Sequence, residues 1–401
     1  MLSRRTPFGL LVACIALLAA APAHALDRVA LHTKLARETA RLGAASGAHV
    51  LDLDEGTVLF SRQPDLALVP ASNEKLFTTA TALLTFGADA RRETAVVASG
   101  VAISDPEAIV AKDLYLVGAG DPSLANADLI SLVDQLVGQV GLTEVAGGVV
   151  GDESLLDARR GSVDSSFKPD FNLGGQLGAL VVGHGTTDGV GPAHLAATRL
   201  QAMLKARGVR FGRRARTGRA PADAEELATD RSPPMSDLVR ATNQPSDNFY
   251  AELLLKVVGA EEGSAGTTVA GAAVVRRTLA RLGVRPTIAD GSGLSRGNRT
   301  NARQIVTLLR AMRIGGTSTA WLRSLSVAGR NGTLRRRMRG TAAAGRCSGK
   351  TGTLRGVSAL SGYCTTTTGH HVVFSFLENG IGFGAKSVED RMVAALARYE
   401  G

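Results

Sequence analysis

A serine and a lysine three positions apart are the pair in this chain best suited to chemistry. They open and close the segment Ser72-Asn73-Glu74-Lys75. Residues three apart on a helix share one face, so the lysine amine can reach the serine hydroxyl and act as its base. A serine activated in this way is a nucleophile for acyl transfer. The pair alone is weak evidence, because a serine at a helix N-terminus is often only an N-cap.

Proton transfer from Ser72 to Lys75 requires an uncharged amine. Free lysine has a pKa of about 10.4, so the pKa of Lys75 must be much lower in the folded protein. Burial lowers the pKa of a lysine, and so does a second cation nearby. Lys350 is the candidate for that second cation, which predicts two lysines in one site.

A second motif, Ser246-Asp247-Asn248, falls in a predicted loop between two helices. Its first and third side chains can face one cleft, where the serine would pass a proton and the asparagine would hydrogen-bond an amide. The same residue types also favour turns and N-caps, which is the structural interpretation of this segment.

A third motif, Lys350-Thr351-Gly352-Thr353, lies in a β pattern. Alternation places the lysine and the glycine on one face of the strand and the threonines on the other. The glycine would let a substrate approach the backbone closely, and the lysine would attract a carboxylate as a point charge. The three motifs in this order predict an active-serine acyltransferase.

Two other patterns imitate known sites. Gly349-Lys350-Thr351 ends like a phosphate-binding loop, but Ala344 stands where that loop needs glycine. The segment 293–297 has the Gly-x-Ser-x-Gly spacing of a nucleophile elbow, but no strand leads directly into its serine. The histidines show no metal-ligand spacing, so we predict neither a metal nor a cofactor.

Hydrophobic periodicity predicts the elements that position these motifs. A helix over 28–42 precedes a hairpin of strands 48–53 and 57–61, and a helix over 72–86 carries the first motif. Further elements surround the other motifs: helices near 235–242, from 249, at 267–282, 301–313 and 386–398, and strands 350–354, 357–364 and 371–377. Helices in the middle and strands at both ends predict an α+β protein with an antiparallel sheet covered by helices.

The segment 93–225 differs in composition from the rest of the chain. It is rich in Gly, Val and Ala, has short strand-like runs such as 113–117, and contains one helix near 128–139. None of the three motifs falls within it. We therefore expect a mostly β domain at 93–225, inserted into a catalytic domain made of 26–92 and 226–401.

Residues 1–25 have the pattern of a secretory signal peptide. Two arginines precede an apolar run, and small residues at positions 23 and 25 form a cleavage site. Cys14 ends a sequence like a lipoprotein processing box, although the apolar run continues well beyond it. Cleavage after Ala25 would place the protein in the periplasm or the extracellular cell envelope.

The chain is basic, with a formal net charge of +10 that falls to +8 when segment 1–25 and its two arginines are removed. A basic exported protein is drawn to anionic wall polymers or to nucleic acid. Arg335, Arg336, Arg337 and Arg339 cluster, but we interpret them as a solvated helix face and expect no nucleic-acid partner.

Two cysteines, Cys347 and Cys364, remain beyond segment 1–25. A tight hairpin that turns at 355–356 sets them opposite each other on neighbouring strands. A cross-strand disulfide is then expected in an oxidising compartment. The alternative is two free thiols.

With these motifs the chain resembles the D-alanyl-D-alanine carboxypeptidase/endopeptidase family, the class C low-molecular-mass penicillin-binding proteins. The likeness covers nearly all of the chain beyond segment 1–25. Other segments typical of the family are 118–124, 290–295, 332–334 and 349–362. The resemblance implies a penicilloyl-serine transferase fold, which is β-lactamase/transpeptidase-like, with an extra domain between the first and second motifs.

The resemblance also implies roles for the catalytic residues. Ser72 would be the nucleophile and Lys75 its general base. Ser246 would relay a proton to the leaving amine, and Asn248 would hold the acyl side of the substrate.

The third motif would bind substrate through Lys350, Thr351, Gly352 and Thr353, of which the lysine and the two threonines would hold the terminal carboxylate. The resemblance further implies an oxyanion hole made by the backbone N–H groups of Ser72 and Thr353.

We therefore predict a serine D,D-peptidase, a D-Ala-D-Ala carboxypeptidase or endopeptidase that acts on peptidoglycan stem peptides through an acyl-enzyme and is inhibited by β-lactams. One alternative is a serine β-lactamase, but the chain lacks the Glu-x-x-Leu-Asn segment of class A enzymes. Another is a non-catalytic wall-binding or penicillin-sensing module. The balance of carboxypeptidase and endopeptidase activity, the cross-link type and the oligomeric state stay open.

Overall fold

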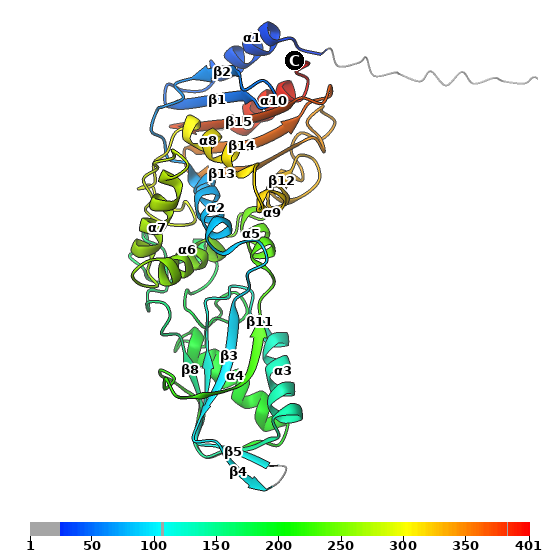
Figure 1. Cartoon of the computed structure of the whole chain (residues 1–401). Helices are drawn as coiled ribbons and strands as arrows, with labels where there is room; N and C mark the ends of the chain where they lie inside the picture. The colour runs from blue at the N-terminus through cyan, green and yellow to red at the C-terminus, as the bar shows by residue number, and fades with distance from the viewer. Residues whose placement is uncertain (1–24, 106–107, 383) are drawn as a thin grey trace, which may run out of the picture.

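A computed structural model describes residues 25–105, 108–382 and 384–401. Figure 1 shows an elongated molecule, with one large sheet and most of the helices at one end and two smaller sheets at the other. The predicted signal peptide and Cys14 lie outside the described residues, apart from Ala25. Among the described helices, none combines the length and the apolar character that crossing a membrane requires.

The large sheet has six strands in the order β12-β13-β14-β15-β1-β2, and each neighbouring pair is antiparallel. Its strands are β1 (Ser46–Asp52), β2 (Val58–Arg62), β12 (Ser326–Val327), β13 (Cys347–Leu354), β14 (Val357–Thr365) and β15 (His371–Asn379). Strands from both ends of the chain therefore meet in one sheet, as the sequence predicts.

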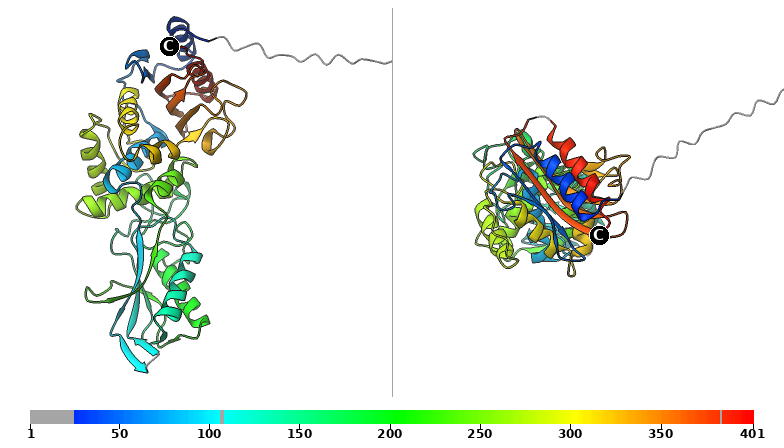
Figure 2. Two further views of the ribbon diagram at one scale, coloured as in Figure 1. Left: turned by 45° about the vertical axis from the view of Figure 1, so that its right-hand side comes forward. Right: turned by 90° about the horizontal axis from the view of Figure 1, so that it is seen from above.

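Helices cover both faces of this sheet. On one face lie α1 (Arg28–Thr39) and α10 (Ala385–Leu396), which run side by side when the molecule is viewed from above (Figure 2). On the other face, one apolar core joins the sheet to the remaining helices of this region: α2 (Glu74–Phe86), α5 (Met235–Asn243), α6 (Asn248–Glu262), α7 (Thr268–Ala280), α8 (Ala302–Met312) and α9 (Ser318–Ser324).

Helix α8 illustrates how the sequence specifies these helices. The side chain of Asn301 caps its N-terminus by accepting the Gln304 N–H at 2.8 Å. Apolar residues recur at the spacing of one helical face, so the helix buries a stripe against the sheet. The stripe consists of Ile305, Leu308, Leu309 and Met312.

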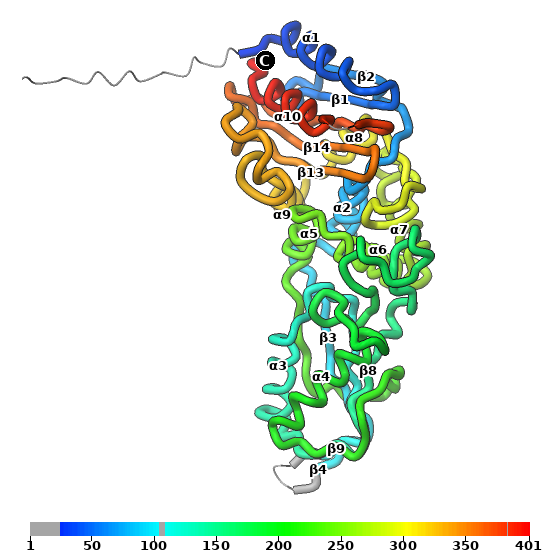
Figure 3. Tube along the Cα trace, turned by 180° about the vertical axis from the view of Figure 1, so that it is seen from behind, coloured from blue at the N-terminus to red at the C-terminus, as the bar shows by residue number. Residues whose placement is uncertain are grey.

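The rest of the chain forms a separate group of sheets and helices between α2 and α5. One sheet has the order β10-β8-β6-β3-β11 and the other the order β4-β5-β7-β9. Figure 3 shows α3 and α4 beside these strands, with β9 and β4 at the far end. The elements are β3 (Glu93–Ser99), β4 (Ala102–Asp105), β5 (Ala108–Ala111), β6 (Asp113–Val117), α3 (Asn126–Asp134), the π-helical turn η2 (Gln135–Gln139), β7 (Leu142–Val145), β8 (Val149–Asp152), the 3₁₀ turn η3 (Phe171–Leu173), α4 (Pro192–Ala206), β9 (Arg210–Phe211), β10 (Arg216–Thr217) and β11 (Glu225–Arg231).

Neighbouring antiparallel strands carry the chain into and out of this group. β3 begins at Glu93 and pairs with β11, so that Glu93 lies opposite Arg231. Because entry and exit are adjacent, the whole group can be added to the parent fold without separating α2 from α5. We propose the boundaries of the inserted domain at 93–231, since β11 completes its sheet beyond the position 225 predicted from sequence. Helix α4 was not predicted.

The strand pairing agrees with the register expected from the hairpin at 355–356. Leu354 lies opposite Val357, and Cys347 lies opposite Cys364. The predicted strands are confirmed, although β13 begins three residues earlier than expected. The predicted helix over 28–42 ends at Thr39. The short elements α9 and β12 were not predicted.

The interpretation of the arginine cluster as a helix face is wrong. The chain there forms the short 3₁₀ turn η4 (Gly332–Leu334) and further turns rather than a helix. Arg337 is largely buried and pairs with Glu389 at 2.7 Å and with Asp390 at 2.8 Å. The sequence pattern could not predict this pairing, because the acidic partners of Arg337 lie more than fifty positions away, on α10.

The structure joins Cys347 and Cys364 in a disulfide between β13 and β14. The bond closes a loop with a sequence separation of 17, for which the chain-entropy model gives a stabilisation of about 3 kcal/mol. We therefore expect reduction of the purified protein to lower its free energy of unfolding by about that amount, measured by urea denaturation. The double variant Cys347→Ala/Cys364→Ala should show no response to reductant. Equal stability of the oxidised and reduced wild type would contradict the prediction.

Candidate active site

Ser72 lies at the junction of two helical segments. The 3₁₀ turn η1 (Ala71–Asn73) leads directly into α2, so Ser72 lies just before the α-helix. The helix predicted over 72–86 therefore begins two residues later than expected, at Glu74. Ala71 has a φ of 47°, a left-handed conformation that is unfavourable for a residue with a side chain. Such strain clusters at functional sites, where the surrounding structure maintains it.

Lys75 lies on the first turn of α2, is fully buried, and has three oxygen neighbours. Its Nζ lies 3.1 Å from the Ser72 hydroxyl, 2.6 Å from Asn248 Oδ1 and 2.6 Å from the Ser292 carbonyl oxygen. An uncharged amine has two N–H bonds and one lone pair. The two carbonyl oxygens can only accept, so they take both N–H bonds and leave the lone pair directed at Ser72.

The electrostatics of Lys75 suit a base. Burial lowers its pKa to about 8, although the carboxyl groups of Asp290, Glu252, Asp247 and Glu74 oppose that change. Of the two causes expected from the sequence, burial is therefore the larger, and the carboxyl groups around Lys75 act in the opposite direction. Lys350 is also fully buried, and burial followed by the charge of Lys75 lowers its pKa well below the usual lysine value.

The second motif lies in the loop between α5 and α6, as predicted. Ser246 has a φ of 67°, which turns its side chain toward the third motif. Its hydroxyl accepts a hydrogen bond from Lys350 Nζ at 2.8 Å. Asn248 is the first residue of α6, and Asp247 caps that helix by accepting the Tyr250 N–H. The loop thus brings Ser246 to one lysine and Asn248 to the other.

The third motif lies in the middle of β13. Gly352 packs against the turn that carries Ser72: a Cβ placed on it would lie 2.6 Å from the Pro70 carbonyl oxygen. The predicted close approach at this glycine is therefore made by the protein's own backbone. Lys350 is enclosed, whereas Thr353 is exposed, and Thr351 donates to the Thr333 hydroxyl at 2.8 Å.

Two contacts connect the inserted domain to the second motif. Asn248 Nδ2 donates to the Asn172 carbonyl oxygen at 2.7 Å. His184 Nε2 lies 2.9 Å from Asp247 Oδ2, and this contact is the main reason why the pKa of His184 is raised. His184 also lines a cavity of about 390 Å³ in the inserted segment, together with residues that include Phe171. No motif or spacing in the sequence indicates that Asn172 or His184 lies at the site.

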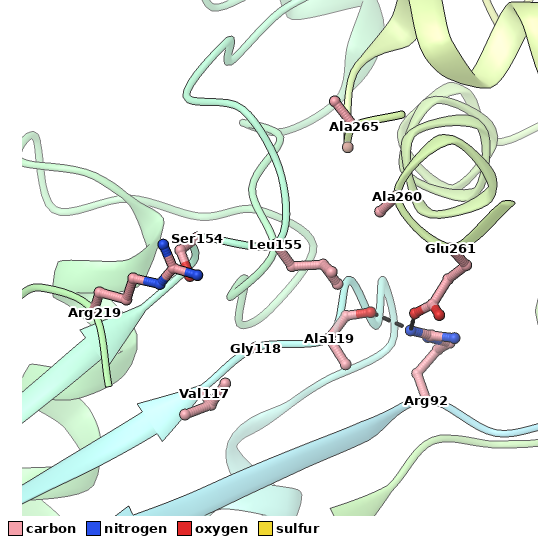
Figure 4. Close-up of a pocket in the computed structure, with 11 residues that line it drawn as sticks. Arg92, Val117, Gly118, Ala119, Ser154, Leu155, Arg219, Ala260, Glu261 and Ala265 are labelled. Carbon is pink, nitrogen blue, oxygen red and sulfur yellow. Dashed lines mark hydrogen bonds and ion pairs between the residues drawn. The ribbon is translucent and has the colours of Figure 1, made fainter. Parts of the chain in front are cut away.

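A larger cavity, of about 500 Å³, lies away from the motifs (Figure 4). It borders the loops after β6 and β8 and the C-terminal end of α6. Arg92 crosses it to pair with Glu261 at 2.6 Å and to donate to the Ala119 carbonyl oxygen. None of the motif residues lines this cavity, so the chemistry is better assigned to the network around Ser72 and Lys75.

The structure also shows why Ser295 is not a second nucleophile. Its side chain is buried, and its hydroxyl holds the loop together by donating to Asp164 at 2.8 Å and accepting the Gly297 N–H at 3.1 Å. Its backbone N–H donates to Asp290. The segment 293–297 is thus a structural loop with a buried serine, despite its elbow-like spacing.

Comparison with known proteins agrees with this site. The chain matches the D-Ala-D-Ala carboxypeptidase 3 (S13) family over residues 29–174 and 183–399. It is similar to the D-alanyl-D-alanine carboxypeptidase of Actinomadura sp. (strain R39), with 33% identity in an alignment that covers 90% of this chain and 82% of the relative. It is also 28% identical to carboxypeptidase DacB of Mycolicibacterium smegmatis, over 92% of this chain and 84% of the relative.

Solved structures support the fold. The crystal structure of penicillin binding protein 4 (dacB) from Haemophilus influenzae matches with a TM-score of 0.76 and 20% sequence identity. The match covers 90% of this chain and 98% of that chain. The predicted penicilloyl-serine transferase fold is thereby confirmed.

Proposed function

Because this chain belongs to the D-Ala-D-Ala carboxypeptidase 3 (S13) family, we propose that its serine D,D-peptidase activity is performed by the network around Ser72. The observation that carries this assignment is the position of Lys75. Its amine lies within hydrogen-bond reach of the Ser72 hydroxyl and is oriented by two carbonyl oxygens. A nucleophile and a fixed base at this distance are what acyl transfer to serine requires.

In the first step, Lys75 takes the proton of Ser72 as its oxygen attacks the carbonyl carbon of the scissile D-Ala-D-Ala bond. The negative charge that forms on the carbonyl oxygen is stabilised by the backbone N–H groups of Ser72 and Thr353. Each such donor typically contributes 10²- to 10³-fold to the rate. The packing of β13 against the turn before Ser72, which Gly352 permits, supports this pairing.

In the second step, the C–N bond breaks and the leaving amine needs a proton. We propose that Ser246 relays it: the Ser246 hydroxyl gives its proton to the amine while its oxygen takes up the proton that Lys75 received from Ser72, which returns Lys75 to its uncharged form. Lys350 Nζ, 2.8 Å from the Ser246 oxygen, orients the hydroxyl during this transfer. Release of D-alanine leaves the acyl-enzyme, which water then hydrolyses. Asn248, whose side chain contacts Lys75 and the Asn172 carbonyl oxygen, is proposed to hydrogen-bond an amide on the acyl side of the stem peptide.

The terminal carboxylate is best placed at the exposed end of the third motif. Thr353 is exposed and offers its hydroxyl directly, whereas Thr351 and Lys350 lie deeper. A bound carboxylate favours the charged form of Lys350, which then attracts the carboxylate as a positive charge behind the threonines. Gly352 shapes this strand without contacting the carboxylate.

Replacing Lys350 should discriminate against substrates with a free carboxylate. We expect Lys350→Met to lower kcat/KM about tenfold more for a peptide ending in free D-Ala-D-Ala than for the same peptide with an amidated C-terminus, a difference of about 1.4 kcal/mol. Both values should also fall, because Ser246 loses its partner. Equal losses for the two peptides would mean that the carboxylate is recognised elsewhere.

The natural substrate is proposed to be the stem peptide of peptidoglycan, and β-lactams are proposed to acylate Ser72. The names of the similar proteins support this, since two of them are carboxypeptidases and one is a penicillin-binding protein. Export is supported by the pattern of segment 1–25 and by a disulfide, which persists in an oxidising compartment.

Incubation of the pure protein with monomeric and cross-linked muropeptides tests the proposed function. Release of D-alanine from monomers would show carboxypeptidase activity, and cleavage of cross-linked dimers would show endopeptidase activity. If neither substrate is cleaved while the folded protein still binds wall material, the proposal fails in favour of a non-catalytic module.

A further inference from the structure

A buried loop behind Lys75 is held by a carboxylate that the proposed mechanism does not use. The loop lies between α7 and α8 and includes Gly291 and Ser292. Glu252, on the second turn of α6, accepts both of their backbone N–H groups through one oxygen, at 3.0 Å from Gly291 and 2.8 Å from Ser292. All three groups are buried, so each N–H would be costly to leave without an acceptor.

Ser292 connects this carboxylate to the catalytic amine. Its N–H is held by Glu252, and its carbonyl oxygen accepts from Lys75 Nζ at 2.6 Å. Gly291 is fixed in the same manner, because its carbonyl oxygen accepts from the Thr78 hydroxyl at 2.9 Å. The loop is therefore tied to α6 on one side and to α2 on the other.

The loop fits closely between its neighbours. A Cβ on Gly291 would lie 2.7 Å from the Ala251 carbonyl oxygen on α6. A Cβ on Gly293, which has a φ of 84°, would lie 2.0 Å from the Ala71 carbonyl oxygen, beside the nucleophile. With so little free space, a displacement of the loop would move the Ser292 carbonyl relative to Lys75.

We propose that Glu252 is a positioning residue for the D,D-peptidase reaction, because it fixes the Ser292 carbonyl that directs the lone pair of Lys75 toward Ser72. The inference rests on the proposed function, since it assumes that Lys75 is the base. Nothing in the sequence motifs indicates this role: Glu252 lies outside all three motifs, and only its position as the fifth residue of α6 places it under the loop.

Glu252 also contributes charge to the site. Burial, with the charge of Asp290, raises the pKa of Glu252 to about 7, so the group is mostly ionised above that pH. Its negative charge then favours the charged form of Lys75. The other charged or titratable groups that act on Lys75 or Glu252 are Glu74 on α2, Asp247 at the N-cap of α6, Lys256 on α6, Asp290 in the loop and Lys350 on β13.

Two variants separate the charge of Glu252 from its contacts. Glu252→Gln keeps the shape and one acceptor oxygen but removes the charge, whereas Glu252→Ala removes both. The matched control is Glu378→Gln, which alters another fully buried carboxyl group, on the α10 face of the sheet beside Glu389. The measurement is the second-order rate of acylation by benzylpenicillin from pH 6 to 10, with the thermal midpoint of each variant.

We expect the pH at which acylation reaches half its maximum to fall by about half a unit or more in Glu252→Gln, because the neighbouring negative charge is gone. In Glu252→Ala the rate of acylation should be lower by about tenfold or more at every pH, since a small misplacement of a catalytic group has effects of this size. Glu378→Gln should match the wild type.

The inference is overturned if Glu252→Gln has the wild-type pH profile, because a purely structural carboxylate would alter stability without moving the profile. It is also overturned if folded Glu252→Ala is acylated at the wild-type rate. Should Glu252→Ala not fold, the profile of Glu252→Gln decides alone. Failure of the wild type to form any adduct would instead refute the proposed function.

Discussion

Replacement of Ser72 by alanine is expected to abolish release of D-alanine from a D-Ala-D-Ala peptide. The side chain contributes little to the core, since it is only partly buried, so the variant should fold normally. Loss of a nucleophile typically lowers kcat by about 10⁶-fold, because no other group can form the acyl-enzyme. The measurement is D-alanine release under saturating peptide, with the thermal midpoint as a check on folding.

Ser295→Ala is the matched control for this result. Ser295 also lies in a segment with a nucleophile-like spacing, but its hydroxyl donates to Asp164 and it is buried in a structural loop. We expect this variant to retain D-alanine release if it folds. Normal release by Ser72→Ala, or its loss in a folded Ser295→Ala protein only, would show that the wrong serine has been assigned.

Replacement of Lys75 by methionine is expected to lower acylation by about 10²- to 10⁴-fold, the usual contribution of a general base. Because the neutral form of Lys75 is active and its pKa is about 8, acylation of the wild type should rise as the pH increases through about 8 and level off above it. The variant should lose this dependence. The rate of benzylpenicillin acylation from pH 6 to 10 measures both effects.

We expect the Lys75→Met variant to fold, although the side chain of Lys75 is buried. Methionine has nearly the same length, and a buried charged group can often be replaced by an apolar one without loss of stability. Thr81→Val serves as a control on the same helix, since the Thr81 hydroxyl is buried and makes no hydrogen bond to the described residues. If Lys75→Met keeps the wild-type rate and pH profile while folded, another group must be the base.

Local sequence patterns correctly predicted many of the helices and strands. The strands around the third motif and the helices α5, α7, α8 and α10 were predicted because each combines a clear periodicity with turn or capping residues at its ends. Helix α4 was missed because its surroundings are rich in glycine and its charged residues obscure the apolar stripe. The buried pairing of Arg337 was missed because its partners are distant in sequence.

The candidate site shows the same limit. Ser72 and Lys75 are close in sequence, so their spacing alone predicted the contact between them. Lys75 meets Asn248 and Ser292 only through tertiary packing, with sequence separations of 173 and 217. The segment 290–295 was noted as typical of the family, but no spacing rule could show that one of its carbonyl oxygens holds the base.

The most direct test of the central claim is to locate the acylated residue. The protein is incubated with excess benzylpenicillin, its intact mass is measured, and the modified peptide is sequenced by mass spectrometry. We expect one added penicilloyl group, attached to Ser72. The absence of an adduct, or an adduct on a different residue such as Ser295, would contradict the assignment of Ser72 as the nucleophile.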